Sequence, residues 1–342
     1  MIQPLLRRAE DAATLGQRLL ATIAPPFELN GQLHHVGLSV GITISETGAP
    51  EQAEELMKAA DMALYRAKDE GRGRVCFFSP DMDAKVQARH AMEIDLRAAI
   101  AEQRLTVQYQ PQVDMMTGGL LGAEALLRWD RPGHGMVPPG DFIGLAEDTG
   151  LIVPIGIWIL REACRRAATW PEHLVIAVNV SPMQFRHPGL YEAIADAIRD
   201  TGIAPSRLEL EITEGVLLQD TDQTLATLQR LRVLGTRLAM DDFGTGYSSL
   251  SYLQKFECDK IKIDRSFVCR IGLDPNAEVL VRAIVGMTEA LGVRTIAEGV
   301  ETSAQADMLR AQGCSEGQGF LYSRPLSGDT FDALARQGEA VS

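Results

Sequence analysis

Cysteine is scarce in this chain, which has five in 342 residues, at positions 76, 164, 258, 269 and 314. Their number is odd, they are scattered, and no C-x-x-C pair occurs. This usage is typical of reduced thiols in the cytosol rather than of a disulfide framework. We therefore predict a cytoplasmic location, either for the protein itself or for the cytoplasmic part of a longer one.

Long hydrophobic runs are also missing. No stretch of 18 uncharged apolar residues occurs, which excludes an apparent transmembrane helix. The first residues, "MIQPLLRRAEDAATL", lack an apolar core followed by a small-residue cleavage site, so they do not form a signal peptide.

Positive charge is in the minority, with 33 Lys and Arg against 46 Asp and Glu and a net charge of -13. This balance disfavours nonspecific binding to a nucleic acid polymer or to anionic lipid. A small ligand that carries phosphate remains compatible with it, because a bound divalent cation can reverse the local field.

The length suggests one large domain or two smaller ones, and a change of pattern near residues 77–85 divides the chain. Before this seam, residues 34–45 are rich in alternating and β-branched residues and predict a strand. Residues 49–71 show apolar residues at three- to four-residue spacing and predict an amphipathic helix that stops at Gly71. This part is short for an independent domain.

After the seam, short apolar strands alternate with helical stretches, a pattern that implies parallel pairing. Eight such units in about 260 residues favour a (β/α)8 barrel of the TIM type, with an open doubly wound sheet as the alternative. The predicted strands are residues 105–110, 120–129, 174–180, 208–213, 237–242, 260–264, 293–298 and 317–322.

Polar residues occur near the carboxyl ends of these strands, although buried barrel strands should be apolar throughout. In such barrels the carboxyl ends of the strands form the active site. Seven consecutive strands carry this feature, and it is the strongest one in the sequence. The residues are Glu124, Arg128, Asn179, Glu211, Glu214, Asp241, Asp242, Lys262, Asp264, Glu298 and Gln318.

Several carboxylates cannot all ionise in one confined site without positive charge nearby. Lys262 supplies one such charge, and divalent metal is the economical source of the rest. Oxygen ligands favour Mg²⁺, Mn²⁺ or Ca²⁺ over zinc, and no histidine falls at these strand ends.

The adjacent carboxylates Asp241 and Asp242 are the most unusual pair in the chain. Successive strand side chains point to opposite faces, so both can face the barrel mouth only if the strand has ended there. Gly244 and Gly246 permit such a turn. The pair would then suit two metal ions about 3.5–4 Å apart, an arrangement that favours in-line displacement at a phosphate ester.

Structural explanations compete with this interpretation for each residue alone. Asp241 and Asp242 would serve as a helix cap and a turn residue, Glu211 and Glu214 as a solvated strand end before an acidic helical turn, and Lys262 as the partner of one acid. These explanations do not account for the whole set together.

The motifs resemble those of EAL domains over residues 85–338. The matching segments are "YQPQVD" (109–114), "EALLRW" (124–129), "NVSPMQF" (179–185), "LELEITE" (208–214), "DDFGTGYSSLSYL" (241–253), "KIKIDRSFV" (260–268), "IAEGVE" (296–301) and "GCSEGQGFLYSRPL" (313–326). The resemblance implies a barrel phosphodiesterase that hydrolyses cyclic di-GMP to linear pGpG, using two Mg²⁺ or Mn²⁺ ions per site.

The same resemblance implies a role for each site residue. Lys262, Glu298 and Glu124 match catalytic positions, and Glu214 matches the residue that stabilises the loop after Asp242. It further implies a homodimer through the barrel, with the segment "DFGTGYSSL" as its moving part. The metal ligands implied are Glu124, Asn179, Glu211, Asp241 and Asp242, and the substrate-binding residues are Arg128, Gln110, Asp264 and Gln318.

Residues 1–79 resemble the C-terminal half of a GGDEF domain, the diguanylate cyclase fold. The signature motif and the nucleotide-binding first half are absent, so we expect no cyclase activity. The chain is then either a fragment of a longer GGDEF–EAL protein or carries a remnant of the domain. A half-sheet exposes its edges, and we expect residues 1 to about 30 to be poorly ordered or to pack on another chain.

The sequence thus predicts an active cyclic di-GMP phosphodiesterase. The alternative is a receptor that binds cyclic di-GMP and signals through dimer or partner contacts without hydrolysing it. A protein-interaction platform is a third possibility that no motif supports. The complete set of predicted metal ligands and catalytic residues favours the enzyme.

Overall fold

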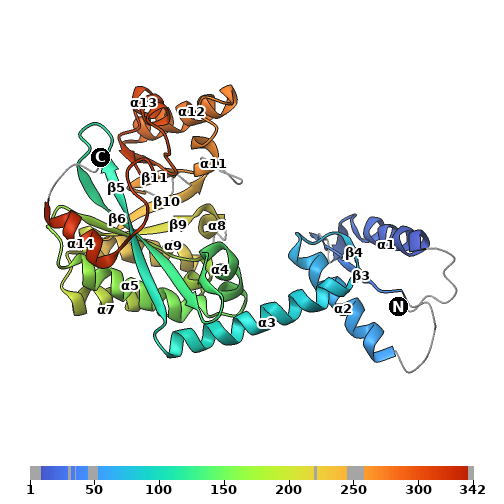
Figure 1. Ribbon diagram of the computed structural model, residues 1–342. Coiled ribbons are helices and arrows are strands. Elements are labelled where there is room, and N and C mark those ends of the chain that lie inside the picture. The colour runs from blue at the N-terminus through green and yellow to red at the C-terminus, as the bar shows by residue number, and fades with distance from the viewer. Residues whose placement is uncertain are drawn as a thin grey trace. The chain divides into compact units, whose positions relative to one another are not determined.

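The computed structural model describes residues 9–29, 32–34, 36–44, 53–218, 222–244 and 258–337. The chain divides into two compact units, Met1–Ile94 and Asp95–Ser342 (Figure 1). The division falls inside helix α3, Pro80–Ala101, whereas the sequence pattern changes at residues 77–85. The predicted domain limits, 1–79 and 85–338, therefore stay a prediction.

The N-terminal unit is built around a βαβ unit. Strands β3 (Val40–Ile42) and β4 (Val75–Phe77) pair in parallel, and helix α2 (Ala53–Asp69) connects them. A Cβ atom on Gly41 would lie 2.2 Å from the backbone nitrogen of Leu64, so only glycine allows this strand to lie so close to α2. The predicted helix is confirmed. Of the predicted strand over residues 34–45, the described residues are in strand only in β3 and at the last residue of β2 (Gln32–His34).

Helix α1 (Ala9–Ile23) and a hairpin of β1 (Phe27–Leu29) with β2 complete this unit. The helix contacts β3 and β4 and buries Ala12. Helix α1 thus packs on its own unit, and the expectation that residues 1 to about 30 are poorly ordered or pack on another chain stays a prediction. Residues 1–8 lie outside the described residues.

The second unit is a closed barrel, which confirms the predicted fold. Its strands follow the order β5-β13-β12-β11-β10-β9-β8-β6, and the pairing of β5 with β6 closes the ring. The strands are β5 (Leu105–Asp114), β6 (Leu120–Arg131), β8 (Val175–Asn179), β9 (Leu208–Thr213), β10 (Arg237–Phe243), β11 (Lys260–Ile263), β12 (Arg294–Ala297) and β13 (Glu316–Gly317). Two short strands extend the sheet, β7 (Gly135–Val137) on β6 and β14 (Leu326–Ser327) on β5.

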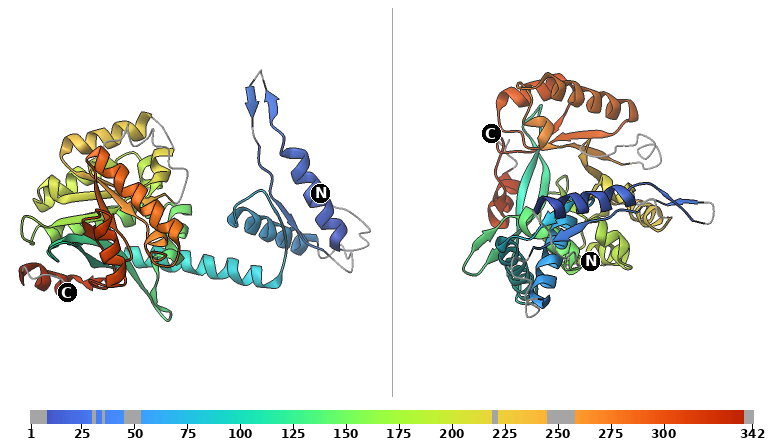
Figure 2. Two further views of the ribbon diagram at one scale, coloured as in Figure 1. Left: turned by 90° about the horizontal axis from the view of Figure 1, so that it is seen from above. Right: turned by 90° about the vertical axis from the view of Figure 1, so that its right-hand side faces the viewer.

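Helices lie around the strands of this unit in all three views (Figures 1 and 2). Helix α12 shows why they form where the sequence predicts: Asp274 caps its first turn through the backbone nitrogen of Asn276, and Gly292 ends it at a φ of 70°. The helices are α4 (Pro139–Asp148), α5 (Ile152–Ala167), α6 (Pro182–Arg186), α7 (Leu190–Thr201), α8 (Glu214–Leu218), α9 (Asp222–Leu234), α11 (Arg265–Val268), α12 (Pro275–Leu291), α13 (Ser303–Ala311) and α14 (Gly328–Gln337).

Strand β5 departs from the predicted parallel pairing, because it is antiparallel to both β6 and β13. A tight turn joins it to β6, with Asp114 Oδ1 accepting hydrogen bonds from the backbone nitrogens of Met116 and Thr117. A parallel crossover needs a dozen or more residues, and this connection is far shorter. The chain therefore folds back as a hairpin.

The eighth predicted strand, residues 317–322, is wrong in extent. Strand β13 ends at Gly317, and the following residues turn. Gly319 has a φ of 158°, and a Cβ atom there would lie 2.2 Å from the carbonyl oxygen of Val300. The two backbone segments lie so close together that only glycine fits at this turn.

All five cysteines are free thiols. Within the described ranges, the structure contains no helix with the length and apolar character that a membrane crossing requires.

Candidate functional site

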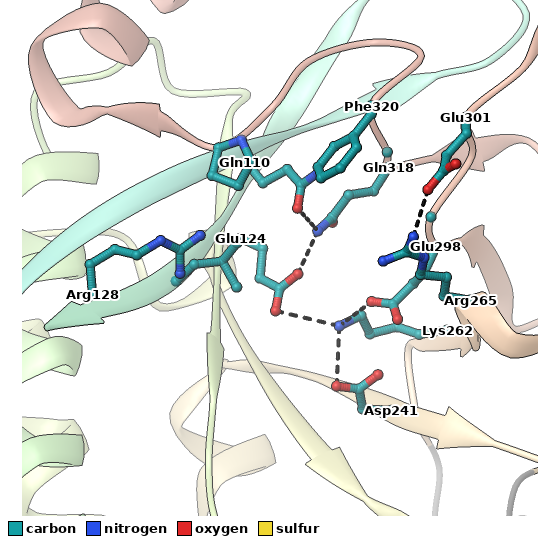
Figure 3. A pocket seen from close by; sticks show the side chains of 14 residues that line it. Gln110, Glu124, Arg128, Asp241, Lys262, Arg265, Glu298, Glu301, Gln318 and Phe320 are labelled. Carbon is teal, nitrogen blue, oxygen red and sulfur yellow. Dashed lines mark hydrogen bonds and ion pairs between the residues drawn. The ribbon is translucent and has the colours of Figure 1, made fainter. Parts of the chain in front are cut away.

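A cavity of about 340 Å³ opens at the carboxyl ends of the barrel strands (Figure 3). Seven of the predicted site residues line it, although they come from six different strands or the turns that follow them. They are Gln110, Glu124, Arg128, Asp241, Lys262, Glu298 and Gln318.

The centre of the site is the ammonium group of Lys262, which is 1 % exposed. Its Nζ lies 2.6 Å from Glu211, 2.7 Å from Glu298, 3.2 Å from Asp241 and 3.7 Å from Glu124. Four carboxyl groups therefore surround one positive charge. An uncompensated excess of negative charge at this depth is costly, and it favours either protonation or a bound cation.

Glu124 is held by amide groups on its other side. Asn179 Nδ2 donates to Glu124 Oε1 at 2.6 Å, and Gln318 Nε2 donates to Glu124 Oε2 at 2.5 Å. Gln318 also donates to Gln110 Oε1 at 3.2 Å (Figure 3). Both carboxylate oxygens of Glu124 thus have fixed donors, which orients the group toward Lys262.

Asp241 and Asp242 lie at an irregularity of strand β10. The register with β11 shifts between Met240 and Phe243, and Asp242 has a left-handed φ of 54°. Its backbone nitrogen donates to Asp241 Oδ1 at 2.9 Å. The strand continues to Phe243, so it has not ended at the two carboxylates as predicted. The bulge instead breaks the regular alternation of side chains.

Three predicted residues lie around this cluster rather than in it. Glu214 Oε1 accepts a hydrogen bond from the backbone nitrogen of Gly244, directly after β10. Asp264 caps helix α11 through the backbone nitrogen of Ser266. Arg128 lines the cavity and donates to Gln108 Oε1 at 2.7 Å. Of the segment predicted to move, residues 245–250 lie outside the described residues.

The electrostatics of the cluster follow from burial. Burial raises the pKa of Glu298 to about 8, and burial together with Glu124 raises the pKa of Glu211 well above its ordinary value. Burial works against the charge of Lys262, but Glu124 and the neighbouring acids raise its pKa well above the usual value. The lysine therefore keeps its proton, and the raised pKa values of Glu211 and Glu298 favour protonation of these acids.

We predict that Glu298 makes the metal-free protein less stable as pH rises. Its raised pKa means that the folded protein holds a proton that the unfolded chain releases above about pH 4.5, so this contribution is full below that pH and is lost as pH rises through 8. Glu298→Gln should remove this dependence of the free energy of unfolding on pH. At pH 8 its free energy of unfolding should exceed that of the wild type by at least about 1 kcal/mol, since one pKa unit is worth about 1.4 kcal/mol. Urea unfolding at several pH values in a chelator measures this free energy for both proteins. An equal change of the free energy of unfolding with pH in the wild type and the variant would contradict the prediction.

The residues fit a divalent cation. Glu211 Oε1 is buried and has no hydrogen-bond partner among the described residues, an arrangement that costs about 1–3 kcal/mol unless a cation or donor satisfies it. The oxygen ligands here are those that Mg²⁺ and Mn²⁺ prefer. Within the described part of the chain, no three His, Cys, Asp or Glu side chains form a ready metal cluster. The acids are turned toward Lys262 instead.

The sequence reasoning missed two parts of the cavity wall. Phe320 is 45 % exposed, and the guanidinium of Arg324 lies 4.4 Å from its ring centroid. Arg265, which also lines the cavity, pairs with Glu301 at 2.7 Å (Figure 3). Phe320 lies in the segment predicted as a strand, and that prediction concealed its place at the mouth.

The family model described as EAL domain matches residues 93–325. This chain belongs to the EAL-domain family. The model described as diguanylate cyclase, GGDEF domain, matches residues 2–74. Both matches confirm the two resemblances found in the sequence, with the EAL match covering the barrel.

Two curated relatives with assigned activities show what this EAL-domain chain is similar to. It is 42 % identical over 324 residues to the bifunctional diguanylate cyclase/cyclic di-GMP phosphodiesterase MucR of Pseudomonas aeruginosa, covering 94 % of this chain and 47 % of MucR. It is 36 % identical over 322 residues to the cyclic di-GMP phosphodiesterase PdeR of Escherichia coli, covering 93 % of this chain and 48 % of PdeR. The chain thus spans about half the length of these relatives.

Solved structures of EAL domains resemble the barrel. The PaMucR phosphodiesterase in its c-di-GMP complex aligns with a TM-score of 0.67 and 43 % identity, covering 69 % of this chain and 98 % of that one. The EAL domain of Mycobacterium smegmatis DcpA aligns with a TM-score of 0.60 and 38 % identity, covering 69 % of this chain and 99 % of that one.

Proposed function

We propose that this chain is a phosphodiesterase that hydrolyses cyclic di-GMP to linear pGpG. The observation that carries the proposal is the group of four acids around Lys262, with one buried oxygen of Glu211 left without a partner, at the mouth of an EAL barrel. Its relatives MucR and PdeR are cyclic di-GMP phosphodiesterases by name.

Two Mg²⁺ or Mn²⁺ ions are the proposed cofactors. When bound, they make water a stronger nucleophile and neutralise charge on the phosphoryl oxygens. The chain offers them oxygen atoms from strands β6, β8, β9 and β10. The proposed ligands are Glu124, Asn179, Glu211, Asp241 and Asp242.

The remaining residues act on the water and the phosphate. Lys262 keeps its proton and presents a fixed positive charge next to the reacting phosphate. Glu298, whose carboxyl group lies 2.7 Å from Lys262 Nζ, is the proposed group that accepts a proton from the attacking water. The water oxygen bonds to phosphorus as the bond from phosphorus to the leaving 3′ oxygen breaks. The 3′ oxygen takes up a proton to become a hydroxyl group, and linear pGpG results.

The cavity wall gives the substrate its proposed contacts. Arg128 carries a positive charge for a phosphate, and Gln110 and Gln318 present amides. Asp264 stays a proposed substrate contact, although its side chain also caps α11. Glu214 is proposed to hold the segment after Asp242 through Gly244, and a homodimer through the barrel stays a prediction.

The test separates an enzyme from a receptor. Cyclic di-GMP is first titrated into the protein in EDTA to measure binding, and Mn²⁺ or Mg²⁺ is then added while the products are separated by chromatography. We expect pGpG only after the metal is added. Binding that persists for hours with metal and without product would instead identify a receptor that does not hydrolyse its ligand.

A further inference from the structure

A second group of charged residues lies toward the amino ends of the barrel strands, with three buried members and the more exposed Arg294. Lys260 is 3 % exposed, and its Nζ lies 2.8 Å from Glu209 and 3.0 Å from Glu316. Arg294 contacts the same two acids at 3.6 and 3.0 Å. Two positive and two negative charges balance here, in contrast to the cluster around Lys262. A buried ion pair often adds little to stability. The contacts of this second cluster with the candidate active site are therefore its more informative feature.

One residue, Gln112, connects this second cluster to the candidate active site. Its Oε1 lies 3.5 Å from Lys260 Nζ, and its Nε2 donates to Gln318 Oε1 at 3.1 Å. Gln318 in turn donates through Nε2 to Glu124 at 2.5 Å. A continuous chain of contacts therefore runs from Lys260 through two amides to the carboxylate of Glu124.

The ammonium group of Lys260 determines how the amides in this series of contacts are oriented. An ammonium group only donates hydrogen bonds, so Gln112 must turn its oxygen toward Lys260 and its NH₂ group toward Gln318. Gln318 then presents its oxygen to Gln112 and its NH₂ group to Glu124. The opposite orientation of Gln318 would place its amide oxygen against the carboxylate, with two acceptors facing each other.

A reversed amide would find few other hydrogen-bond partners, because Gln112 is 2 % exposed and Gln318 is 4 % exposed. A buried amide without partners costs free energy, so the orientation of one member determines that of the next. Of the contacts described above, those with Gln110 and Glu124 would be left to orient Gln318 if the contact with Gln112 were lost.

We propose that Gln112 is a positioning residue: it transmits the orientation imposed by Lys260 to Gln318, and so fixes the orientation of the carboxylate of Glu124, a proposed metal ligand. The inference rests on the metal-dependent function proposed above and adds a residue to it. Gln112 does not touch the substrate or the reacting atoms, and acts only through Gln318.

The test compares Gln112→Met with a matched control. Methionine has a similar length and no amide, so it fills the space but neither donates to Gln318 nor accepts from Lys260. Thr236→Val is the control, because Thr236 is 5 % exposed and its hydroxyl donates to the backbone oxygen of Leu231 at 2.9 Å, apart from this chain of contacts. Both variants lose a buried hydrogen bond in the same unit.

The main measurement is the dissociation constant of Mn²⁺ alone, by titration calorimetry without substrate, together with the melting temperature. We expect Gln112→Met to bind Mn²⁺ about 10-fold more weakly or worse, as is typical for residues that orient metal ligands. Thr236→Val should melt a few degrees lower and bind Mn²⁺ like the wild type.

Three results would overturn the inference. Mn²⁺ binding by Gln112→Met within about two-fold of the wild type would show that Gln112 does not act on the metal site. An equal loss in both variants would assign the effect to stability. No Mn²⁺ binding by the wild type would remove the proposed metal site itself, and this control separates that failure from the failure of Gln112.

Discussion

Lys262→Met will lower the free energy of unfolding of the metal-free protein by about 3–5 kcal/mol at neutral pH, the usual cost of removing one partner from a buried ion pair. Four acids lose their shared cation, and Glu211 and Glu298 lie 2.6 and 2.7 Å from it. Acid should reduce the loss, because protonated carboxyl groups no longer repel. Urea unfolding at pH 5 and pH 7.5 in a chelator measures both effects.

Lys260→Met is the matched control for this variant. The two lysines lie two residues apart on β11 and are both buried, but Lys260 shares its acids with Arg294. Mn²⁺ should raise the melting temperature of Lys262→Met more than that of the wild type, because the cation replaces the lost ammonium. It should give Lys260→Met no such additional increase. A Lys262→Met protein as stable as the wild type at pH 7.5 would contradict the described cluster.

Glu124→Gln will reduce the turnover of cyclic di-GMP by about 10³-fold at saturating Mn²⁺, comparable to the loss of a central electrostatic group in other enzymes. The substitution keeps the size of the side chain but removes its charge, and Glu124 contacts Lys262, Asn179 and Gln318. The initial rate of pGpG formation measures the effect.

The control for Glu124→Gln is Glu209→Gln, which also neutralises a buried glutamate of the barrel. Glu209 contacts Lys260 and lies in the second cluster, around Lys260. Its variant should retain turnover within about five-fold of the wild type. An equal loss of turnover in the two variants would mean that neutralising either buried glutamate has the same effect. It would refute a specific role for Glu124.

The barrel could be predicted because its strands are short, apolar and separated by helical patterns. The direction of β5 could not be predicted by that rule, because apolar alternation is the same in either direction. The deciding signal was the turn chemistry of Asp114 and the glycines at 118 and 119, which the alternation argument overlooked.

The strand-end rule found the residues around Lys262, since side chains from neighbouring strand ends must meet at one mouth. It missed the second cluster, around Lys260, although the sequence contains its signal. Glu209 and Glu211 are two residues apart, as are Lys260 and Lys262, and residues at this spacing face the same side of a strand. Two layers of polar side chains inside the barrel follow from that spacing. The partners within each layer depend on strand register, which the sequence does not give.

The most direct test of the account is hydrolysis of cyclic di-GMP in ¹⁸O-labelled water, with Mn²⁺ and with a chelator, followed by mass spectrometry of the product. The account predicts pGpG that carries a single ¹⁸O atom in its terminal phosphate, formed with Mn²⁺ and not in the chelator. Unchanged cyclic di-GMP in the presence of Mn²⁺, or pGpG without the label, would contradict it.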